Sequence, residues 1–174
     1  MKGANRQDDL YQEAIASFGA GIERLARAYE ADADKRNDLL QEIHLALWRS
    51  FQIFEDRCSM RTWIYRVAHN AATSYVVRQS RLNSSTLLTL EEVEAAEQID
   101  YAREAERRRA LDQLFKLIRQ LKPPDLQIML LYLEGMEAPT IGEITGLSPG
   151  HVRTQINRIK TILNPRFHSG GNRG

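Results

Sequence analysis

Apolar residues recur at steps of three and four along most of the 174-residue chain, and this spacing constrains its fold class most strongly. The first such series contains Tyr11, Ile15, Phe18, Ile22, Leu25 and Tyr29, all on one face of a helix. No run alternates apolar and polar residues with the period of two that indicates a half-buried strand. The sequence therefore predicts an all-α protein, and its 43% hydrophobic and 27% charged residues are ordinary for a globular chain.

Two further helices are expected in the first half of the chain. A polar stretch at 30–37 interrupts the first apolar stripe, and Asn37 or Asp38 can cap the next helix. The apolar side of that helix comprises Leu39, Leu40, Ile43, Leu47 and Trp48. A third helix is predicted from Met60 to about Arg78. Its inward-facing residues are expected to be Ile64, Val67, Ala68, Ala71 and Tyr75.

The middle of the chain is acidic and separates two blocks of helical pattern. Residues 83–106 contain one Lys or Arg against seven Asp and Glu, and they follow an Asn-Ser-Ser-Thr run. Such a polar, turn-forming start favours a domain boundary. We therefore predict two small helical domains, at 1–82 and 107–174, joined by an acidic linker at 83–106 that becomes helical near its end.

The second block begins with two short helices and continues into a helix-turn-helix pattern. A helix at about 103–121 is expected to stop at Pro123 and Pro124, and 126–133 reads as a short apolar helix closed by Glu134 and Gly135. Thr140 and Glu143 have the spacing of a capping box. Gly146 permits a tight turn, and Ser148-Pro149 can start the next helix.

The last predicted helix has one aliphatic face and one polar, basic face. The aliphatic stripe consists of Val152, Ile156, Ile159 and Leu163, and the opposite face carries His151, Arg153, Thr154, Gln155, Asn157, Arg158 and Lys160. The second helix of a helix-turn-helix fits the DNA major groove. Arginine and asparagine can pair with base edges, whereas Lys160 suits phosphate. The residues after 167 read as a frayed tail.

Two stretches without any acidic residue, 57–90 and 144–174, suggest two contacts with a polyanion such as DNA. In the first, Trp63, Arg66 and Asn70 fall on one helical face, with Arg61 near the helix start. An aromatic ring beside arginine and amide groups can bind an unpaired base. A tryptophan at helical spacing is also typical of a core, so both roles remain open for Trp63.

Several other classes of protein are disfavoured. No apolar run approaches the roughly 18 residues of a membrane span, and the N-terminus lacks a signal-peptide core, so we expect a cytoplasmic protein without membrane insertion. The four histidines lie far apart, which predicts surface positions and no metal site. No nucleophile motif, carboxylate cluster or cofactor motif is present, so no enzyme activity and no cofactor are expected.

Three motifs in order resemble those of bacterial RNA polymerase sigma factors of the extracytoplasmic-function (ECF) group. They are Asp38-Leu-Leu-Gln-Glu42 with Leu47-Trp48, then Arg61-Thr-Trp-Ile-Tyr-Arg-Val-Ala-His-Asn70, and finally Glu143 through Arg158. The resemblance extends over roughly residues 11–163. The chain departs from the family pattern at Gln155, where members often carry arginine, and at Ser17-Phe-Gly-Ala-Gly21, which replaces the usual lead-in containing Gly-Asp.

The resemblance implies roles for specific residues. Polymerase binding, on the clamp helices of the largest catalytic subunit, would fall to Asp38, Gln41, Glu42, Leu47 and Trp48. Contacts with the minus-ten element would come from Phe54, Arg61, Trp63, Arg66 and Asn70, with Asn70 reading a flipped base in a pocket lined by Phe54. Contacts with the minus-thirty-five duplex would come from Arg153, Thr154, Asn157, Arg158 and Lys160.

The function implied by the resemblance is transcription initiation. Such a factor binds core RNA polymerase, directs it to promoter DNA and assists opening, and the group is commonly held inactive by an anti-sigma protein. The alternative is a stand-alone helix-turn-helix regulator that binds duplex DNA and uses its N-terminal helices to oligomerise. The acidic helix at 38–48 separates the two hypotheses, because a sigma factor needs it free for polymerase.

Overall fold

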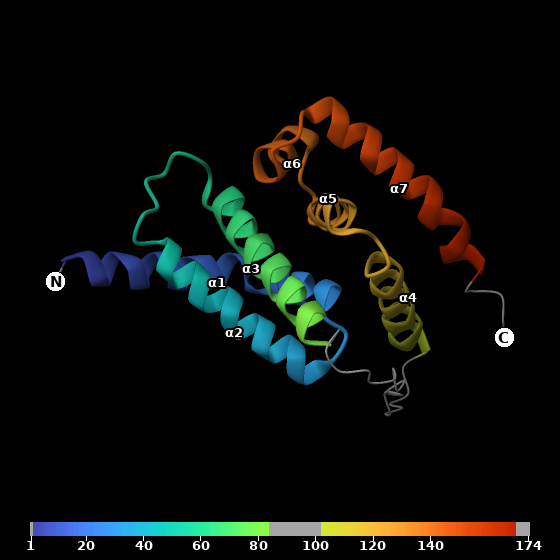
Figure 1. The fold of residues 1–174 in the computed structure, drawn as a ribbon, viewed down its shortest axis with the longest axis horizontal. Helices are drawn as coiled ribbons and strands as arrows, with labels where there is room; N and C mark the ends of the chain where they lie inside the picture. The colour runs from blue at the N-terminus through green and yellow to red at the C-terminus, as the bar shows by residue number, and fades with distance from the viewer. Residues whose placement is uncertain (1, 84–101, 170–174) are drawn as a thin grey trace.

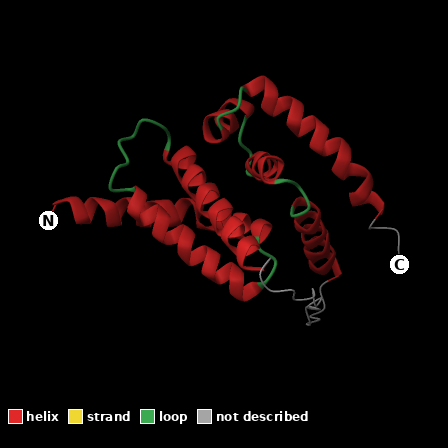
Figure 2. Cartoon of the chain, viewed as in Figure 1, coloured by secondary structure: helices red, strands yellow, loops and turns green. Residues whose placement is uncertain are grey.

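The computed structural model describes residues 2–83 and 102–169, which form seven helices and no strand (Figures 1 and 2). They are α1 (Lys2–Tyr29), α2 (Ala33–Ser50), α3 (Met60–Asn83), α4 (Ala102–Ile118), α5 (Pro123–Leu133), α6 (Ala138–Thr145) and α7 (Pro149–Ser169). The all-α prediction is confirmed.

Helices α1, α2 and α3 pack against one another through their predicted apolar faces. Leu39, Ile43 and Leu47 of α2 are fully buried, as are Ile64 and Ala68 of α3. Each large aliphatic side chain removed from water contributes about 1.5–3 kcal/mol. The three-and-four spacing therefore identified the face of each helix that holds this bundle together.

The predicted start of α2 is wrong by about one and a half turns. Asp32 is the N-cap, and its carboxylate accepts a hydrogen bond of 2.9 Å from the backbone N–H of Lys35. Asn37 and Asp38, the expected caps, lie inside the helix. The polar run after Asp32 has no apolar periodicity, yet its residues are compatible with an exposed first turn, so the helix starts before its buried face does.

The helix-turn-helix consists of α6 and α7 joined by a left-handed turn. Gly146 has φ 78°, which glycine adopts without the steric cost that a side chain would add. Ser148 accepts a hydrogen bond of 3.3 Å from the backbone N–H of His151 at the start of α7. Val152, Ile156, Ile159 and Leu163 are all buried. The predicted turn, cap and aliphatic stripe of α7 are confirmed.

Three other boundaries in the C-terminal half differ from the sequence prediction. The capping box is wrong, because α6 begins at Ala138 and Thr140 lies within its first turn. Helix α4 ends at Ile118, before the predicted Leu121, and the two prolines open α5 instead of only ending α4. This agrees with the preference of proline for the first helical positions, where its missing N–H leaves no partner unsatisfied.

The predicted linker falls mostly on residues 84–101, which lie outside the described residues. Its last five positions, 102–106, belong to α4, and the predicted frayed tail is helical up to Ser169. The two halves of the molecule pack together, since one apolar cluster includes Ile64 of α3, Leu131 of α5 and Ile144 of α6. In Figure 1, α5 and α6 accordingly lie beside α3.

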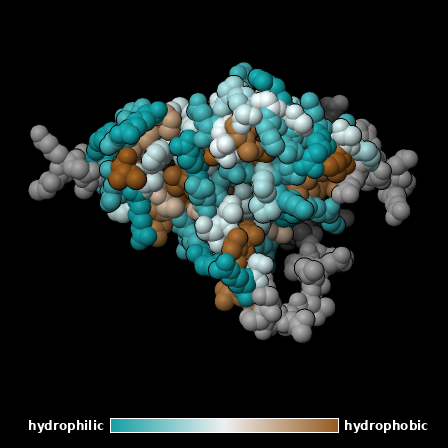
Figure 3. All heavy atoms as spheres, turned by 45° about the horizontal axis from the view of Figure 1, so that its top comes forward, coloured by the Kyte–Doolittle hydropathy of each residue, from teal (hydrophilic) through white to brown (hydrophobic). Residues whose placement is uncertain are grey.

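The exposed surface is mainly polar. On the face drawn in Figure 3, hydrophobic residues form separate patches in a largely hydrophilic surface. Exposed large apolar residues of the N-terminal helices include Leu45, Trp48 and Val77. None of the helices in the described part of the chain combines the length and apolar character of a membrane span.

Candidate protein and nucleic-acid interfaces

The outer face of α2 presents polar groups above a fully apolar underside. Asp38 and Gln41 are exposed, and Glu42 accepts a hydrogen bond of 2.6 Å from the guanidinium of Arg78 on α3. This ion pair anchors one acid of the face and leaves the other two polar groups available. Lys35 and Arg49 are also exposed on α2, so the helix presents charges of both signs, which suits contact with a protein partner more than with DNA.

Of the two apolar residues predicted for polymerase binding, only Trp48 reaches the surface. Its side chain is 37% exposed, and its indole N–H donates a 2.8 Å hydrogen bond to the Asp8 carboxylate on α1. Leu47 is 0% exposed in this conformation, so its role as a contact residue stays a prediction. A leucine in an amphipathic motif supports the surface from beneath when it falls on the buried stripe.

The aromatic residues before and within α3 are packed into the N-terminal domain. Trp63 is half-buried, its indole N–H donates to the Ser50 hydroxyl at 2.9 Å, and its ring centroid lies 5.3 Å from that of Phe54. Phe54 itself is buried. In this conformation the core role of Trp63 dominates, and Phe54 holds that ring from below instead of lining an open pocket.

The polar residues predicted for minus-ten DNA differ in their surroundings. Asn70 is exposed on α3. Arg61 donates a hydrogen bond to the backbone carbonyl of Glu134, and Arg66 donates one of 2.8 Å to the backbone carbonyl of Glu143. Both acceptors belong to the C-terminal half. The structure therefore leaves the amide accessible while the two guanidinium groups contact the other domain.

A buried polar pair lies under α3. His69 is 1% exposed, and its Nδ1 lies 2.9 Å from the hydroxyl of Tyr29 on α1. Burial lowers the pKa of His69 to about 3 and raises that of Tyr29 to about 12, so both are neutral at ordinary pH. The surface position expected for this histidine is wrong, because the end of α1 covers it.

The outer face of α7 is exposed as predicted. Arg153, Thr154 and Asn157 point to solvent, and Thr154 also bonds back to the carbonyl of Gly150 at 3.1 Å. Arg153 and Asn157, with Lys160, border a surface hollow of about 500 Å³ next to the turn between α5 and α6. Their donors are suited to base edges or phosphate at a groove.

Two basic residues of this face are held by neighbours on α5. Arg158 forms an ion pair of 2.5 Å with Asp125, and the Lys160 ammonium lies 4.3 Å from the ring centroid of Tyr132. The Lys160 ammonium also donates a 2.6 Å hydrogen bond to the Tyr132 hydroxyl. Both contacts orient long side chains that would otherwise be mobile.

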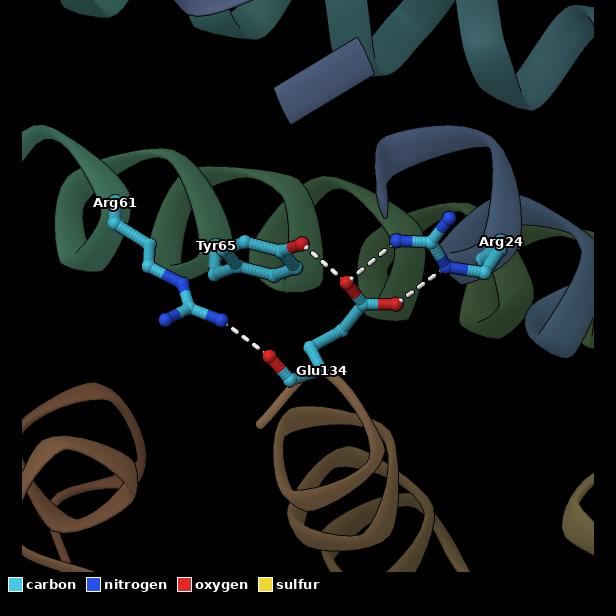
Figure 4. A network of polar contacts seen from close by, with 4 residues as sticks. All are labelled: Arg24, Arg61, Tyr65 and Glu134. Atoms are coloured by element: carbon cyan, nitrogen blue, oxygen red, sulfur yellow. Dashed lines mark hydrogen bonds and ion pairs between the residues drawn. The ribbon is translucent and has the colours of Figure 1, made fainter. Parts of the chain in front are cut away.

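Sequence reasoning missed a group of residues that joins the two halves, with Glu134 at its centre (Figure 4). Its members are remote in sequence, and the only local signal was the helix-ending Glu-Gly pair. No cluster of three or more potential metal-ligating side chains occurs within the described residues.

Taken together, a helical bundle with an exposed polar face on α2 and a helix-turn-helix with a basic face form the arrangement of a DNA-binding protein with a separate surface for a protein partner. The Sigma-70 region 2 family model matches residues 15–82, and the Sigma-70 region 4 model matches residues 111–163. Between them the two models account for most of the chain, in the order expected. The chain belongs to the ECF group of sigma factors, and thus functions as an alternative sigma factor.

Curated relatives and solved structures agree with this assignment. The chain is 29% identical over 162 residues to the ECF RNA polymerase sigma-E factor of Escherichia coli K12, covering 88% of this chain and 80% of the relative. It is 26% identical over 171 residues to the RNA polymerase sigma-H factor of Pseudomonas aeruginosa, covering 94% and 87%.

Two solved structures share the fold. The sigma factor RpoE from Bartonella quintana, crystallised with the anti-sigma factor NepR, matches with a TM-score of 0.66 at 18% identity, over 90% of this chain and 97% of that one. CnrH in complex with the cytosolic domain of CnrY matches with a TM-score of 0.67 at 16% identity, over 97% and 94%. At these identities the likeness establishes the fold alone.

Proposed function

We propose that this protein acts in the cytoplasm, where it binds core RNA polymerase through α2 and directs it to promoters through α3 and α7, with no catalysis of its own. The observation that carries the proposal is the exposed polar face of α2 around Asp38 and Gln41, on a chain that matches both sigma-70 regions. This face is separate from the two basic surfaces. One molecule can thus hold the polymerase and DNA at the same time.

The proposed binding roles are assigned to the two halves of the molecule. The N-terminal half, through α3, would bind polymerase and the minus-ten element, and the half from α4 onward would bind the minus-thirty-five element, with the acidic segment between them crossing the polymerase. Asn70 supports the minus-ten role, because its exposed amide can accept from and donate to a base removed from the stack. Trp63, supported by Phe54, would form one side of that site.

The α7 face is proposed to read duplex DNA in the major groove. Arg153 and Asn157 would contact base edges, while Arg158 and Lys160 would contact phosphates. Thr154 lies between them and can contact either. The ion pair of Arg158 with Asp125 and the contact of Lys160 with the Tyr132 ring would hold the two side chains in place before DNA arrives, which reduces the entropy lost on binding.

A regulator that covers one or both surfaces is also proposed. Both solved structures that share the fold are complexes with a partner, one of which is named an anti-sigma factor. Exposed apolar residues on the N-terminal helices, Leu45, Trp48 and Val77, offer contact area to such a protein. Its identity would have to be found by capture from the native host.

The test of the polymerase role compares variants of α2 in a binding and transcription assay. Asp38→Ala with Gln41→Ala should weaken association with core polymerase about tenfold, which is ~1.4 kcal/mol, and lower promoter-specific initiation in parallel. Glu13→Ala, which removes an exposed acid from α1, is the matched control and should change neither. Failure of the wild-type protein to bind polymerase, with tight binding to an operator alone, would favour the stand-alone regulator.

A further inference from the structure

The end of α2 and the loop after it contact three consecutive residues near the start of α1. Gln7 is 5% exposed, and its side-chain amide donates a 2.7 Å hydrogen bond to the backbone carbonyl of Trp48. Asp8 accepts one of 2.8 Å from the Trp48 indole N–H, and Arg6 forms an ion pair of 3.4 Å with Asp56 in the loop. Arg6, Gln7 and Asp8 form what we call the α1 brace.

The sequence at the end of α2 contains no usual helix terminator. Neither glycine nor proline occurs between Leu45 and Ser59. Phe51, the residue after the last helical position, still has helical backbone angles, with φ −70° and ψ −11°. Glycine and proline are the strongest local signals for the end of a helix. Local chemistry therefore leaves the end of α2 undetermined.

The hydrogen bonds of the last turn indicate what ends α2. In a continuing α-helix the Trp48 carbonyl would accept from the backbone N–H of Gln52, four residues later. Here that N–H donates to the carbonyl of Arg49 at 3.2 Å, and the Trp48 carbonyl accepts from Gln7 instead. The Gln7 side-chain oxygen also accepts from the Gln52 side chain at 3.4 Å. The Gln7 amide thus takes the place of the N–H that would extend the helix.

The point at which α2 ends determines how the loop 51–59 supports Trp63. The ring centroid of Phe54, in this loop, lies 6.0 Å from that of Phe51 and 5.3 Å from that of Trp63. Ser50, the last residue of α2, accepts a hydrogen bond of 2.9 Å from the Trp63 indole N–H. One more helical residue would rotate the following chain by about 100° around the helix axis and carry Phe54 away from Trp63.

The same loop contains a residue in a rarely occupied backbone conformation. Asp56 has φ 55°, in the left-handed region, which aspartate tolerates better than most residues other than glycine. Such conformations persist where neighbouring contacts hold them, and the Arg6 ion pair is one such contact. Its side chains are 59% and 71% exposed, so water weakens the pair. The buried Gln7 is therefore the principal member of the α1 brace.

We propose that Gln7 is a positioning residue for the minus-ten site. By ending α2 at Ser50 it sets the shape of the loop 51–59 and keeps Phe54 against Trp63. The inference rests on the proposed function, in which Trp63 forms one side of that site. It gives a role to a part of α1 that precedes residues 15–82, the range matched by the Sigma-70 region 2 model. Gln7 acts through the loop and needs no contact with DNA.

The structural test uses the two tryptophans of the full chain as reporters. Trp48 and Trp63 each have an indole N–H, and that of Trp63 donates to Ser50 at the end of α2. Proton–nitrogen correlation NMR records the two signals separately. Gln7→Ala should shift the Trp63 signal, whereas Gln12→Ala, the same substitution at an exposed position of α1, should not. An unshifted Trp63 signal in Gln7→Ala would overturn the link between the α1 brace and the loop.

A second variant separates loss of the hydrogen bond from loss of volume. Gln7→Glu keeps the size and the helix propensity of glutamine, but a carboxylate has no N–H to donate to the Trp48 carbonyl. It should shift the Trp63 signal in the same direction as Gln7→Ala, while circular dichroism shows unchanged helicity. A Trp63 signal at the parent position in Gln7→Glu would mean that the amide donor does not end α2.

The functional arm measures base selection by the holoenzyme, with competing promoters that differ at one minus-ten position. Gln7→Ala and Gln7→Glu should each lower the preference for the selected base by about fivefold, because the wall of the site moves while the amide of Asn70 remains. Association with core polymerase should stay at the level of the Gln12→Ala control. An equal loss of polymerase association would indicate general damage to the N-terminal half and overturn the positioning role.

The parent and Asn70→Ala proteins distinguish failure of this inference from failure of the proposed function. If the parent selects a base, Asn70→Ala loses that selection and both Gln7 variants retain it, the positioning role is wrong and the minus-ten site stands. If the parent holoenzyme shows no selection at any minus-ten position, the proposed minus-ten function is wrong, and the role of Gln7 in it is wrong as well.

Discussion

The two predicted DNA-binding faces, on α3 and α7, differ in the residues buried under each helix and in the partners of their polar side chains. Under α7 the contacts are aliphatic, from Val152 to Leu163, whereas α3 covers the buried polar pair His69 and Tyr29. The polar face of α7 is exposed to solvent. On α3, by contrast, the guanidinium groups of Arg61 and Arg66 donate to carbonyls of the C-terminal half.

If the two faces bind DNA as proposed, this difference separates duplex recognition by α7 from strand opening by α3. An exposed, preoriented face such as that of α7 can bind duplex DNA without rearrangement. On α3 the Asn70 amide is exposed, but Arg61 and Arg66 are hydrogen-bonded to backbone carbonyls of the C-terminal half. We therefore expect the minus-thirty-five contact to form without rearrangement, whereas contact of Arg61 and Arg66 with the minus-ten element requires them to leave their carbonyl partners.

The largest expected effect is on α7. Replacing both Arg153 and Asn157 with alanine removes two potential base contacts, each worth about 1–3 kcal/mol when bidentate. Binding of the holoenzyme to duplex containing the minus-thirty-five element should fall by about 100-fold, while binding to polymerase alone stays constant. Fluorescence anisotropy with labelled duplex measures the first quantity. His151→Gln on the same helix is the control, and an equal loss there would contradict specific readout.

The next effect distinguishes the cores under the two faces by pH. Because the folded-state pKa of His69, about 3, lies below its unfolded value of 6.5, the unfolded chain takes up the proton first on acidification. The stabilisation is complete above pH 6.5 and falls by about 1.4 kcal/mol per pH unit below it. Urea unfolding at pH 7, 6 and 5 measures this slope.

The variant His69→Gln should lose that part of the slope while keeping a polar side chain at the site. His151→Gln, on the exposed face of α7, should unfold with the slope of the parent protein. Parallel slopes for the parent and His69→Gln would mean that the buried histidine is not the source of the acid sensitivity. Because the buried side of α7 is aliphatic, it should contribute nothing comparable to the pH dependence of unfolding.

A smaller effect is expected from the exposed amide of α3. Asn70→Ala should lower the preference of the holoenzyme for one base of the minus-ten element by about tenfold, or ~1.4 kcal/mol, because a flipped base loses its hydrogen-bonding partner. Competition between promoters that differ at a single position measures this preference. Polymerase affinity should stay at the parent level, and a uniform loss of polymerase binding would contradict the assigned role.

Local chemistry made α7 and its turn predictable from the sequence. Gly146, Ser148 and Pro149 act within a few residues of where they stand, and the aliphatic stripe of α7 needs no knowledge of its neighbours. The prediction of the start of α2 was wrong because local chemistry offered two candidates. Asp32 and Asn37 are both good caps, and the pattern alone favoured the cap nearest the first buried residue.

Contacts between distant segments explain what the sequence could not show. Arg24 and Glu134 are 110 residues apart, and nothing near either one indicates the other. His69 was expected at the surface, whereas its ring is buried and contacts Tyr29 at the end of α1, 40 residues away in the sequence. Trp63 had two possible roles, and its ring packs against Phe54, which lies in the loop before α3. Tertiary packing, which helical periodicity does not encode, decided each case.

The smallest expected effect tests whether preorientation of the α7 face contributes to binding. Asp125→Asn removes the ion pair with Arg158, whose side chain is 50% exposed, so water screens much of the interaction and stability should change by less than about 1 kcal/mol. Duplex affinity depends on two opposing consequences. Loss of the acid removes a repulsion from phosphate, while loss of the pair lets the guanidinium move.

We expect the lost repulsion between Asp125 and phosphate to outweigh the added mobility of Arg158 at low salt. Asp125→Asn should then bind duplex about twofold more tightly than the parent, and this gain in affinity should shrink as the salt concentration rises. The measurement is a salt titration of duplex binding by holoenzyme carrying Asp125→Asn or the parent chain. Weaker binding at every salt concentration would instead mean that Asp125 positions Arg158 for DNA. In that case the faces of α7 and α3 would both depend on contacts made before DNA arrives. The remaining difference would be that α7 is held by its own half of the molecule, whereas α3 contacts the other half.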